Sequence, residues 1–309
     1  MQSKGIVFLI GILQVCCTSV MATCRSANHM EQIDSIFASD ARLHLISDQF
    51  SFTEGPTADN RGNVYFTDQP NDRIWKYDTE GKLSLFMEGT MRSNGMYFSP
   101  EGNLISCADK ENQLVSITPD RKITVLVDSL GGKRLNGPND VWVHPNGDMY
   151  FTDPLYERPY WKEEVVRMTS ENVYYLPHGA DIALIADADI EKPNGIIGTP
   201  DGQILYVADI KADKTYRYEI GRNGKLKNRK LFVSQGSDGM TIDNRGNIYL
   251  TGKGVTVYNQ EGGKIAQIDV PADWTANVCF GGKDHNVLFI TASQFVFSLN
   301  VLVSGAGKK

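Results

Sequence analysis

Residues 139–153 read NDVWVHPNGDMYFTD, a polar pair followed by two short apolar runs with a turn between them. Aromatic and β-branched residues on both sides of the turn favour strands, and the segment Pro-Asn-Gly-Asp has the turn chemistry that a hairpin needs. The stretch therefore predicts two antiparallel strands, the first of which begins at Asn139 and Asp140.

This pattern of a polar residue, a strand, a turn and a second strand recurs along the chain. The other copies begin at Glu54, Asn94, Asn194, Asp238 and, in degenerate form, Ala276. All six starts lie 38 to 55 residues apart, close to the roughly 40 to 50 residues of a four-stranded propeller blade. Further short strand-like segments follow each copy, and no helical pattern of useful length competes with them. We predict an all-β fold, a six-bladed β-propeller of four-stranded antiparallel blades.

The last copy contains only three strand-like segments, whereas the segment LHLIS at residues 43–47 stands alone before the first copy. Pairing the two would complete the sixth blade and hide two open sheet edges. We therefore predict that an N-terminal strand closes the ring. The predicted organisation is a signal peptide at 1–22, an N-terminal extension at 23–42, the propeller at 43–303 and a C-terminal tail at 304–309.

The N-terminus has the order of features found in exported proteins. Lys4 precedes an apolar run that ends in the small-residue pattern Val20-Met21-Ala22, after which the chain becomes polar. This order predicts export to the periplasm or the medium, with no integral membrane domain in the mature protein. The alternatives are a membrane anchor, since the run is nearly long enough to span a bilayer, and a lipoprotein attached at Cys24, although Thr23 fits such a site poorly.

Composition excludes several classes of function. The 309 residues are 41% hydrophobic and 22% charged with a net charge of −6, which is typical of a soluble globular protein. No basic stripe suggests a nucleic-acid partner. Neither a CxxC motif nor a Cys/His metal spacing occurs, which argues against zinc. Cys107 and Cys279 lie in apolar strand-like runs and are predicted to be buried thiols.

The polar residues that open the copies should meet on the propeller axis, because the first strand of each blade lines the central channel. The predicted ring consists of Glu54, Asn94, Asn139, Asn194, Asp238 and Ala276, of which five carry a side-chain oxygen. Such a crowd of oxygens is costly unless a hard cation binds it. Oxygen-only ligation and two carboxylates favour Ca²⁺, with Mg²⁺ or Mn²⁺ as weaker candidates. The alternative is that these residues cap strand starts through Asx-type turns.

Four aspartates recur at a second position of the copies, where the first hairpin returns to the same face. These residues are Asp68, Asp109, Asp153 and Asp209. Their recurrence predicts that they cap loops, with a supporting role behind the cation ligands as the alternative.

Several fragments, in order, resemble the family of senescence marker protein, gluconolactonase and luciferin-regenerating enzyme. They are FTEGP (52–56), GGKRLNGPNDV (131–141), YFTDP (150–154), PNGI (193–196), LYVAD (205–209) and SDGM (237–240). The resemblance is closest to bacterial gluconolactonases and implies a six-bladed calcium propeller. It places metal ligands at Glu54, Asn139, Asn194 and Asp238, and it suggests Asp238 as the catalytic base. Animal members carry an arginine where this chain has Gly137, so their substrate contacts do not transfer; Lys133 or Arg134 is a candidate to reach the site instead.

The predicted activity is that of a lactonase: calcium-dependent hydrolysis of a small-molecule sugar lactone, in which the metal polarises the carbonyl and Asp238 assists the attack of water. Asn94, Asn139 and Tyr156 are the candidate substrate contacts. Tyr156, Tyr160 and Trp161 belong to an insertion in the third copy that could form the rim of the site or pack on the neighbouring blade. Two other hypotheses remain open, hydrolysis of other esters or organophosphates and a noncatalytic metal-binding propeller. The sequence does not indicate an oligomeric state.

Overall fold

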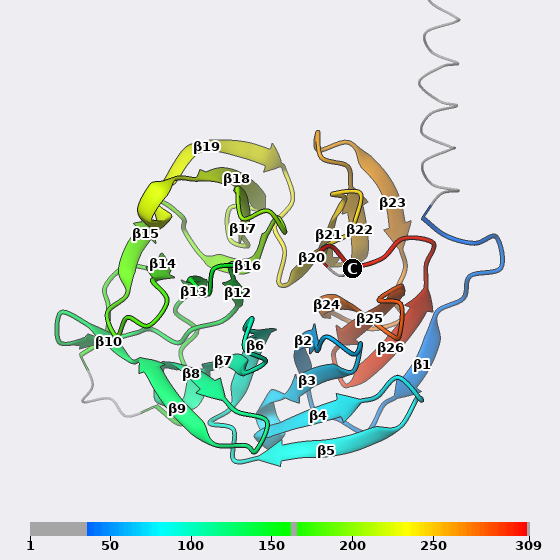
Figure 1. Ribbon diagram of the computed structural model, residues 1–309, viewed down its shortest axis with the longest axis horizontal. Coiled ribbons are helices and arrows are strands. Elements are labelled where there is room, and N and C mark those ends of the chain that lie inside the picture. The colour runs from blue at the N-terminus through cyan, green and yellow to red at the C-terminus, as the bar shows by residue number, and fades with distance from the viewer. Residues whose placement is uncertain (1–35, 162–165, 308–309) are drawn as a thin grey trace, which may run out of the picture.

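The computed structural model describes residues 36–161 and 166–307, and within them six four-stranded sheets surround a central channel (Figure 1). The predicted six-bladed, all-β propeller is confirmed. The predicted signal peptide, its cleavage site and Cys24 lie outside the described residues. Among the described residues, no helix is long and apolar enough to cross a membrane.

The first three blades follow one another along the chain, and each runs from the channel outward. Blade one consists of β2 (Thr53–Ala58), β3 (Val64–Asp68), β4 (Arg73–Tyr77) and β5 (Leu83–Glu88). Blade two consists of β6 (Ser93–Phe98), β7 (Leu104–Ala108), β8 (Gln113–Ile117) and β9 (Ile123–Val127). Blade three consists of β12 (Val141–Val143), β13 (Met149–Asp153), β14 (Asn172–Leu176) and β15 (Leu184–Asp187).

The remaining blades repeat the arrangement. Blade four consists of β16 (Pro193–Gly198), β17 (Ile204–Asp209), β18 (Lys214–Ile220) and β19 (Leu226–Val233). Blade five consists of β20 (Met240–Ile242), β21 (Ile248–Gly252), β22 (Gly254–Tyr258) and β23 (Lys264–Ile268). Blade six contains β24 (Thr275–Gly281), β25 (Val287–Ala292) and β26 (Phe295–Asn300). A small hairpin, β10 (Ser129–Leu130) with β11 (Lys133–Arg134), precedes blade three, and three 3-10 turns occur at η1 (Gln69–Asn71), η2 (Asp109–Glu111) and η3 (Arg222–Gly224).

The turn at Asp243 shows how a sequence motif closes the first hairpin of a blade. One carboxylate oxygen of Asp243 accepts hydrogen bonds from the backbone N–H groups of Arg245 and Asn247, both at 2.9 Å. The other oxygen accepts from the Asn247 side chain and from the hydroxyl of Tyr249. The buried carboxylate thus satisfies the polar groups of the turn, which lets β20 and β21 pair tightly in register.

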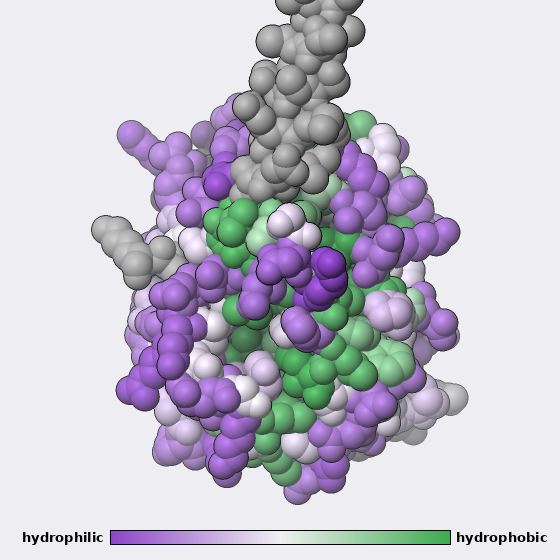
Figure 2. Space-filling view, turned by 90° about the vertical axis from the view of Figure 1, so that its right-hand side faces the viewer, coloured by the Kyte–Doolittle hydropathy of each residue, from purple (hydrophilic) through white to green (hydrophobic). Residues whose placement is uncertain are grey.

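The strand β1 (His44–Ser47) completes blade six. It pairs antiparallel with β26, with His44 opposite Ser298 and Leu45 opposite Phe297, so the predicted closure of the ring is confirmed. Figure 1 shows this junction, where β1 lies beside β26. The side of the molecule that carries β1 is drawn in Figure 2, where apolar side chains gather between polar ones. Leu45 itself keeps 54% of its surface exposed.

The hydrophobic core lies between neighbouring blades rather than in one central cluster. One cluster joins blades three, four and five through side chains such as Trp142, Leu205 and Leu250. Another joins blades five and six, and includes Ile36 from the segment ahead of β1. Because each sheet packs on the next, the inner strands are held in a ring of defined geometry, which positions the residues at their ends.

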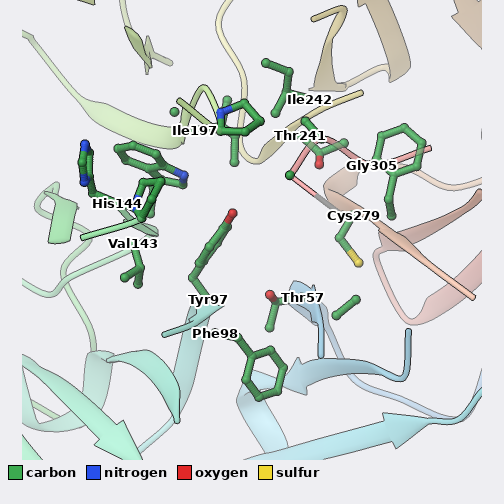
Figure 3. A pocket seen from close by; sticks show the side chains of 18 of the residues that line it. Thr57, Tyr97, Phe98, Val143, His144, Ile197, Thr241, Ile242, Cys279 and Gly305 are labelled. Carbon is green, nitrogen blue, oxygen red and sulfur yellow. The ribbon is translucent and has the colours of Figure 1, made fainter. Parts of the chain in front are cut away.

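A cavity of about 340 Å³ lies at the end of the inner strands opposite the predicted ring (Figure 3). Tyr97, Val143, Ile197 and Thr241 line it, and no Asp or Glu occurs among the described residues that surround it. The C-terminal segment passes this opening, where the N–H of Ala306 donates to the carbonyl of Ile242. This end of the channel therefore differs in chemistry from the predicted ring, which carries Glu54 and Asp238.

Candidate functional site

The polar residues predicted to form a ring lie around one pocket. Its volume is about 510 Å³, and Glu54, Asn94, Asn139 and Asp238 line it together with Tyr156. Asn194, which is buried, belongs to the same group because its side-chain Nδ2 lies 3.1 Å from the Tyr156 hydroxyl that it donates to. The structure thus brings together the four predicted metal ligands, Glu54, Asn139, Asn194 and Asp238, and the predicted substrate contacts Asn94 and Tyr156.

Local backbone irregularities set the positions of the ring residues. The pairing register shifts near Glu54, Asn94, Asn194 and Ala276, at the start of the inner strand in four blades. In the other two blades the ring residue precedes the strand. Asn139 lies two residues before β12 and Asp238 two residues before β20. The prediction that a strand begins at Asn139 was therefore wrong by two residues, because the regular β12–β13 pairing begins only at Val141.

A second level of residues lies next to the ring. Four of its six positions are glycines, namely Gly55, Gly95, Gly195 and Gly239, and the other two are Asp140 and Asn277. A Cβ atom on Gly95 would lie 2.4 Å from Oδ1 of Asp140, and one on Gly239 would lie 1.9 Å from Cγ of Asn277. Gly95 and Gly239 therefore leave the space that the two larger side chains fill, whereas Gly55 and Gly195 lie against the backbone of the next blade.

Asp140 and Asn277 connect this level to the ring. The Asn277 side chain acts to lower the pKa of Asp140, and its Nδ2 lies 3.5 Å from Oε2 of Glu54. Oδ1 of Asp140 also accepts from the N–H of Val141 at 2.9 Å. Burial nevertheless raises the pKa of Asp140 to about 8. Sequence reasoning left the role of Asp140 open and missed Asn277. The available signal was that four of the six copies have glycine at the position that Asn277 occupies in the last copy.

The two ring carboxylates oppose each other electrostatically. Burial, followed by the charge of Asp238, raises the pKa of Glu54 well above its ordinary value. Burial also raises the pKa of Asp238, although hydrogen bonds from Trp274 and Asn194 act in the opposite direction. Both groups are therefore costly to ionise together unless a positive charge lies between them.

Two amide oxygens give an independent test of whether a cation fits. Oδ1 of Asn94 and Oδ1 of Asn194 are buried and have no hydrogen-bond partner among the described residues. Buried acceptors are normally satisfied, so these two oxygens indicate that a donor or a cation belongs there. Among the described residues, no three His, Cys, Asp or Glu side chains lie close enough together to hold a metal ion by themselves. Carboxylates and amides together would therefore supply the ligands. An oxygen donor set of this kind fits Ca²⁺ better than zinc.

Asp238 has a partner that the sequence did not indicate. The indole Nε1 of Trp274 donates to Oδ2 of Asp238 at 2.6 Å, and Trp274 lines the pocket. Trp274 belongs to the segment before β24, outside the repeated hairpin, so no repeat pattern could reveal it. The bond fixes one oxygen of Asp238 and orients the carboxylate at the pocket wall.

The described part of the blade-three insertion contacts both the pocket and blade two. Tyr156 lines the pocket, and burial raises its pKa to about 12. Tyr160 donates from its hydroxyl to Oδ2 of Asp109 at 2.6 Å, whereas Nε1 of Trp161 donates to the carbonyl oxygen of Asp109 at 2.9 Å. The two roles proposed for the insertion, rim and packing, are thus divided between neighbouring aromatic residues.

The recurring aspartates cap loops in three blades. Asp68 accepts from the backbone N–H groups of Ser51 and Phe52. Asp153 accepts from those of Asn136 and Gly137, and Asp209 accepts from those of Glu191 and Lys192. Capping is confirmed for these three residues.

Asp109 differs, because the side chains of Gln69 and Tyr160 donate to it and Arg158 forms an ion pair with it. Capping of a loop through backbone N–H groups was therefore the wrong prediction for this residue. Its carboxylate faces the insertion of the neighbouring blade.

Two basic residues suggested as substitutes for a missing arginine do not line the pocket. Lys133 is exposed on β11, and Nη1 of Arg134 donates to the carbonyl of Glu111. A Cβ atom at Gly137 would lie 2.9 Å from Asp109 and 3.0 Å from Trp161. Trp161 of the insertion thus occupies the space into which a side chain at this position would point. Arg158, which the sequence analysis did not single out, lines the pocket instead.

Comparison with known proteins places this geometry in a family. Residues 52–294 match the model of the SMP-30/gluconolactonase/LRE-like region. The chain belongs to this family. Among family relatives, the gluconolactonase of Zymomonas mobilis subsp. mobilis is 29% identical, over 89% of this chain and 85% of that protein. The pentonolactonase of Haloferax volcanii is 25% identical, over 78% of this chain and 81% of its own length.

A solved structure agrees with the family assignment. The gluconolactonase of Xanthomonas campestris superposes with a TM-score of 0.79 at 26% identity, over 87% of this chain and 92% of that one. The resemblance stated from the sequence fragments is confirmed at the level of the family and of its propeller fold.

Proposed function

We propose that this protein hydrolyses a sugar lactone at the pocket formed by Glu54, Asn94, Asn139, Asn194 and Asp238, with a divalent cation, preferably Ca²⁺, as its cofactor. The observation that carries the proposal is that two carboxylates and Asn94, whose buried Oδ1 is unsatisfied, line one pocket, while Asn194, with a second unsatisfied Oδ1, bonds the pocket residue Tyr156. Support comes from the activities named for the relatives, a gluconolactonase and a pentonolactonase. Their different substrates leave the sugar open.

The cation would be held by Glu54, Asn139, Asn194 and Asp238, and it would supply Lewis-acid polarisation of the lactone carbonyl. The two carboxylates match its charge. Asn94, with its buried and unsatisfied Oδ1, is positioned to contact either the cation or the substrate.

Asp238 is the general base in this proposal. It takes a proton from water as the water oxygen bonds to the carbonyl carbon, and the ring C–O bond then breaks. The proton returns to the departing ring oxygen, so the product is the open-chain hydroxy acid. Trp274 holds Oδ2 of Asp238 and thereby leaves Oδ1 to face the water. Tyr156 orients the substrate from the rim and is held by Asn194.

A pH-stat panel of aldonolactones, measured with calcium and with a chelator and corrected for spontaneous hydrolysis, tests the proposal. We expect the protein to hydrolyse lactones, the chelator to abolish this activity, and added calcium to restore it. Hydrolysis of carboxylic esters or organophosphates alone would assign the site to another reaction. Metal binding by calorimetry without hydrolysis of any substrate would identify a binding propeller.

A further inference from the structure

Arg158 introduces a positive charge into a pocket that is otherwise acidic, amide-lined and aromatic. Among the described residues that line the pocket, it has the one cationic side chain. That side chain is 28% exposed, so part of it remains available to a ligand. Because Arg158 belongs to the insertion and not to the repeated hairpins, its presence is independent of the predicted metal ring.

The position of Arg158 is set by blade two. Nε of Arg158 lies 2.9 Å from Oδ2 of Asp109, whose side chain is 4% exposed. The same carboxylate oxygen accepts from Tyr160 at 2.6 Å, and the backbone carbonyl of Asp109 accepts from Trp161. Three neighbouring residues of the insertion are therefore tied to one residue of the η2 turn.

These contacts hold the guanidinium group of Arg158 in place, so it can act as an oriented hydrogen-bond donor. The carboxylate of Asp109 balances the positive charge of Arg158, which makes an anionic substituent a poor match for the pair. The buried Nε of Arg158 has no hydrogen-bond partner among the described residues, so its contact with Asp109 is an ion pair. The four other N–H groups of the guanidinium lie in the same rigid plane and can be offered to a ligand. A lysine at this place would direct its compact charge to Asp109 and lack such a fork.

We infer that Arg158 is a specificity-determining residue that hydrogen-bonds the hydroxyl groups of a polyhydroxylated lactone ring. The inference rests on the proposed function, and it names the part of the substrate that the insertion recognises. Neighbouring hydroxyl oxygens can accept from the two ends of a guanidinium fork. The ring residues at the base of the pocket would meanwhile face the ester group, so the two ends of the substrate are recognised by separate elements of the fold.

Two substrates separate recognition of hydroxyl groups from chemistry at the ester. D-glucono-1,5-lactone carries the hydroxyls, whereas δ-valerolactone has the same ring without them. We expect Arg158→Met to lower kcat/KM for the hydroxylated lactone by roughly 10- to 100-fold, chiefly through KM, as for a lost hydrogen bond to a charged group. The loss with δ-valerolactone should be at least about tenfold smaller. Arg158→Lys should fail to restore KM.

Arg167→Met is the matched control. Arg167 lies on the returning limb of the same insertion and stacks on Trp161 at 4.5 Å, but it does not line the pocket. This variant should leave the ratio between the two substrates unchanged. Equal losses on both lactones in Arg158→Met, or a shift of the ratio in Arg167→Met as large as that in Arg158→Met, would overturn the inference.

A binding measurement keeps the inference testable if the proposed reaction fails. 1,5-Anhydro-D-glucitol has the ring hydroxyls but no carbonyl, so calorimetry reports its binding without turnover. Arg158→Met should bind it at least about tenfold more weakly than the wild type and Arg167→Met. Equal affinities would refute the role of Arg158. A wild type that binds this ring and hydrolyses no lactone would refute the proposed function alone. A wild type that neither hydrolyses a lactone nor binds this ring would refute both.

Discussion

Nε1 of Trp274 lies 2.6 Å from Oδ2 of Asp238, and this bond joins the segment entering blade six to the segment entering blade five. The bond favours the ionised form of Asp238 and restricts its rotation. Trp274 thereby acts on the proposed base from outside the repeated hairpins.

Replacing the indole should reduce catalysis without emptying the site. We expect Trp274→Phe to lower kcat by roughly tenfold at saturating calcium, since a hydrogen bond to a charged group is lost. Trp75→Phe is the matched control, because the buried Nε1 of Trp75 has no hydrogen-bond partner among the described residues. Steady-state kinetics that show equal, small effects for both variants would contradict the role assigned to Trp274.

Asp238 is assigned two roles, ligand and base, and these can be separated. Asp238→Asn retains an oxygen for the cation but removes the base, so turnover should fall by at least about 100-fold even when calcium saturates the weakened site. Calorimetry must first establish that saturation. A calcium-loaded variant with near wild-type turnover would transfer the role of base to another group at the pocket.

Glu54 should dominate the binding of calcium. Glu54→Gln removes one of two ring carboxylates, and we expect at least a roughly tenfold weaker calcium affinity by calorimetry. Asn94→Ala should weaken binding less, because it removes no charge. Glu88→Gln, which alters an exposed ion pair with Arg73 on the outer strands, is the control expected to bind normally. Equal losses in Glu54→Gln and Asn94→Ala would show that the ligand assignment is wrong.

The small residues of the second level should be intolerant of substitution. Gly239→Ala places a methyl group 1.9 Å from Cγ of Asn277, which must then move away from Glu54. We expect a loss of about 1–3 kcal/mol in the free energy of unfolding, together with weaker calcium binding. Gly263→Ala, next to the side chain of Asn259 at 3.1 Å, should be nearly neutral in denaturant titrations. An unchanged calcium affinity in Gly239→Ala would show that the second level does not influence the ring.

Buried carboxyl groups predict how the stability of the metal-free protein depends on pH. Burial raises the pKa of Asp140 to about 8 and that of Asp153 to about 7, against roughly 3.9 in the unfolded chain. Between these values the folded state binds more protons than the unfolded state, so the free energy of unfolding should decrease as pH rises from 4 to 8.

Each of these groups contributes a decrease of up to about 1.4 kcal/mol per pH unit, so the expected decrease between pH 5 and pH 8 is on the order of several kcal/mol. Urea denaturation in chelator at pH 5 and pH 8 measures it, and equal stabilities would contradict the prediction. Asp153→Asn should make the decrease smaller, because it removes one of the buried carboxyl groups whose pKa is raised.

The repeated parts of the site were predictable from the sequence. Glu54, Asn139 and Asp238 occupy equivalent places in the first, third and fifth hairpins, and strand pairing fixes where that place lies in a blade. The family fragments added chemical roles, which remain predictions. The start of regular pairing at Val141 was not predictable, because the end of a strand is set by its hydrogen bonds and not by the side-chain pattern from which strands are recognised.

The residues missed by sequence reasoning come from segments without a repeat. Trp274 and Arg158 lie in connections whose lengths and compositions differ from blade to blade, so no column of equivalent residues exists for comparison. Their contacts with Asp238 and Asp109 depend on how neighbouring blades are placed side by side. Such contacts follow from the assembled ring and not from any single hairpin.

The pairing of β1 with β26 has a consequence for biosynthesis. The ribosome makes β1 before the other strands of the propeller, whereas its partner β26 is the last of them and ends at Asn300. During translation β1 therefore has no partner strand until β26 has been made. A nascent chain that stops early would display an unpaired strand bearing Leu45, and such strands pair with other chains. A complete chain thus differs from a truncated one in that its β1 is paired and no longer open to other chains.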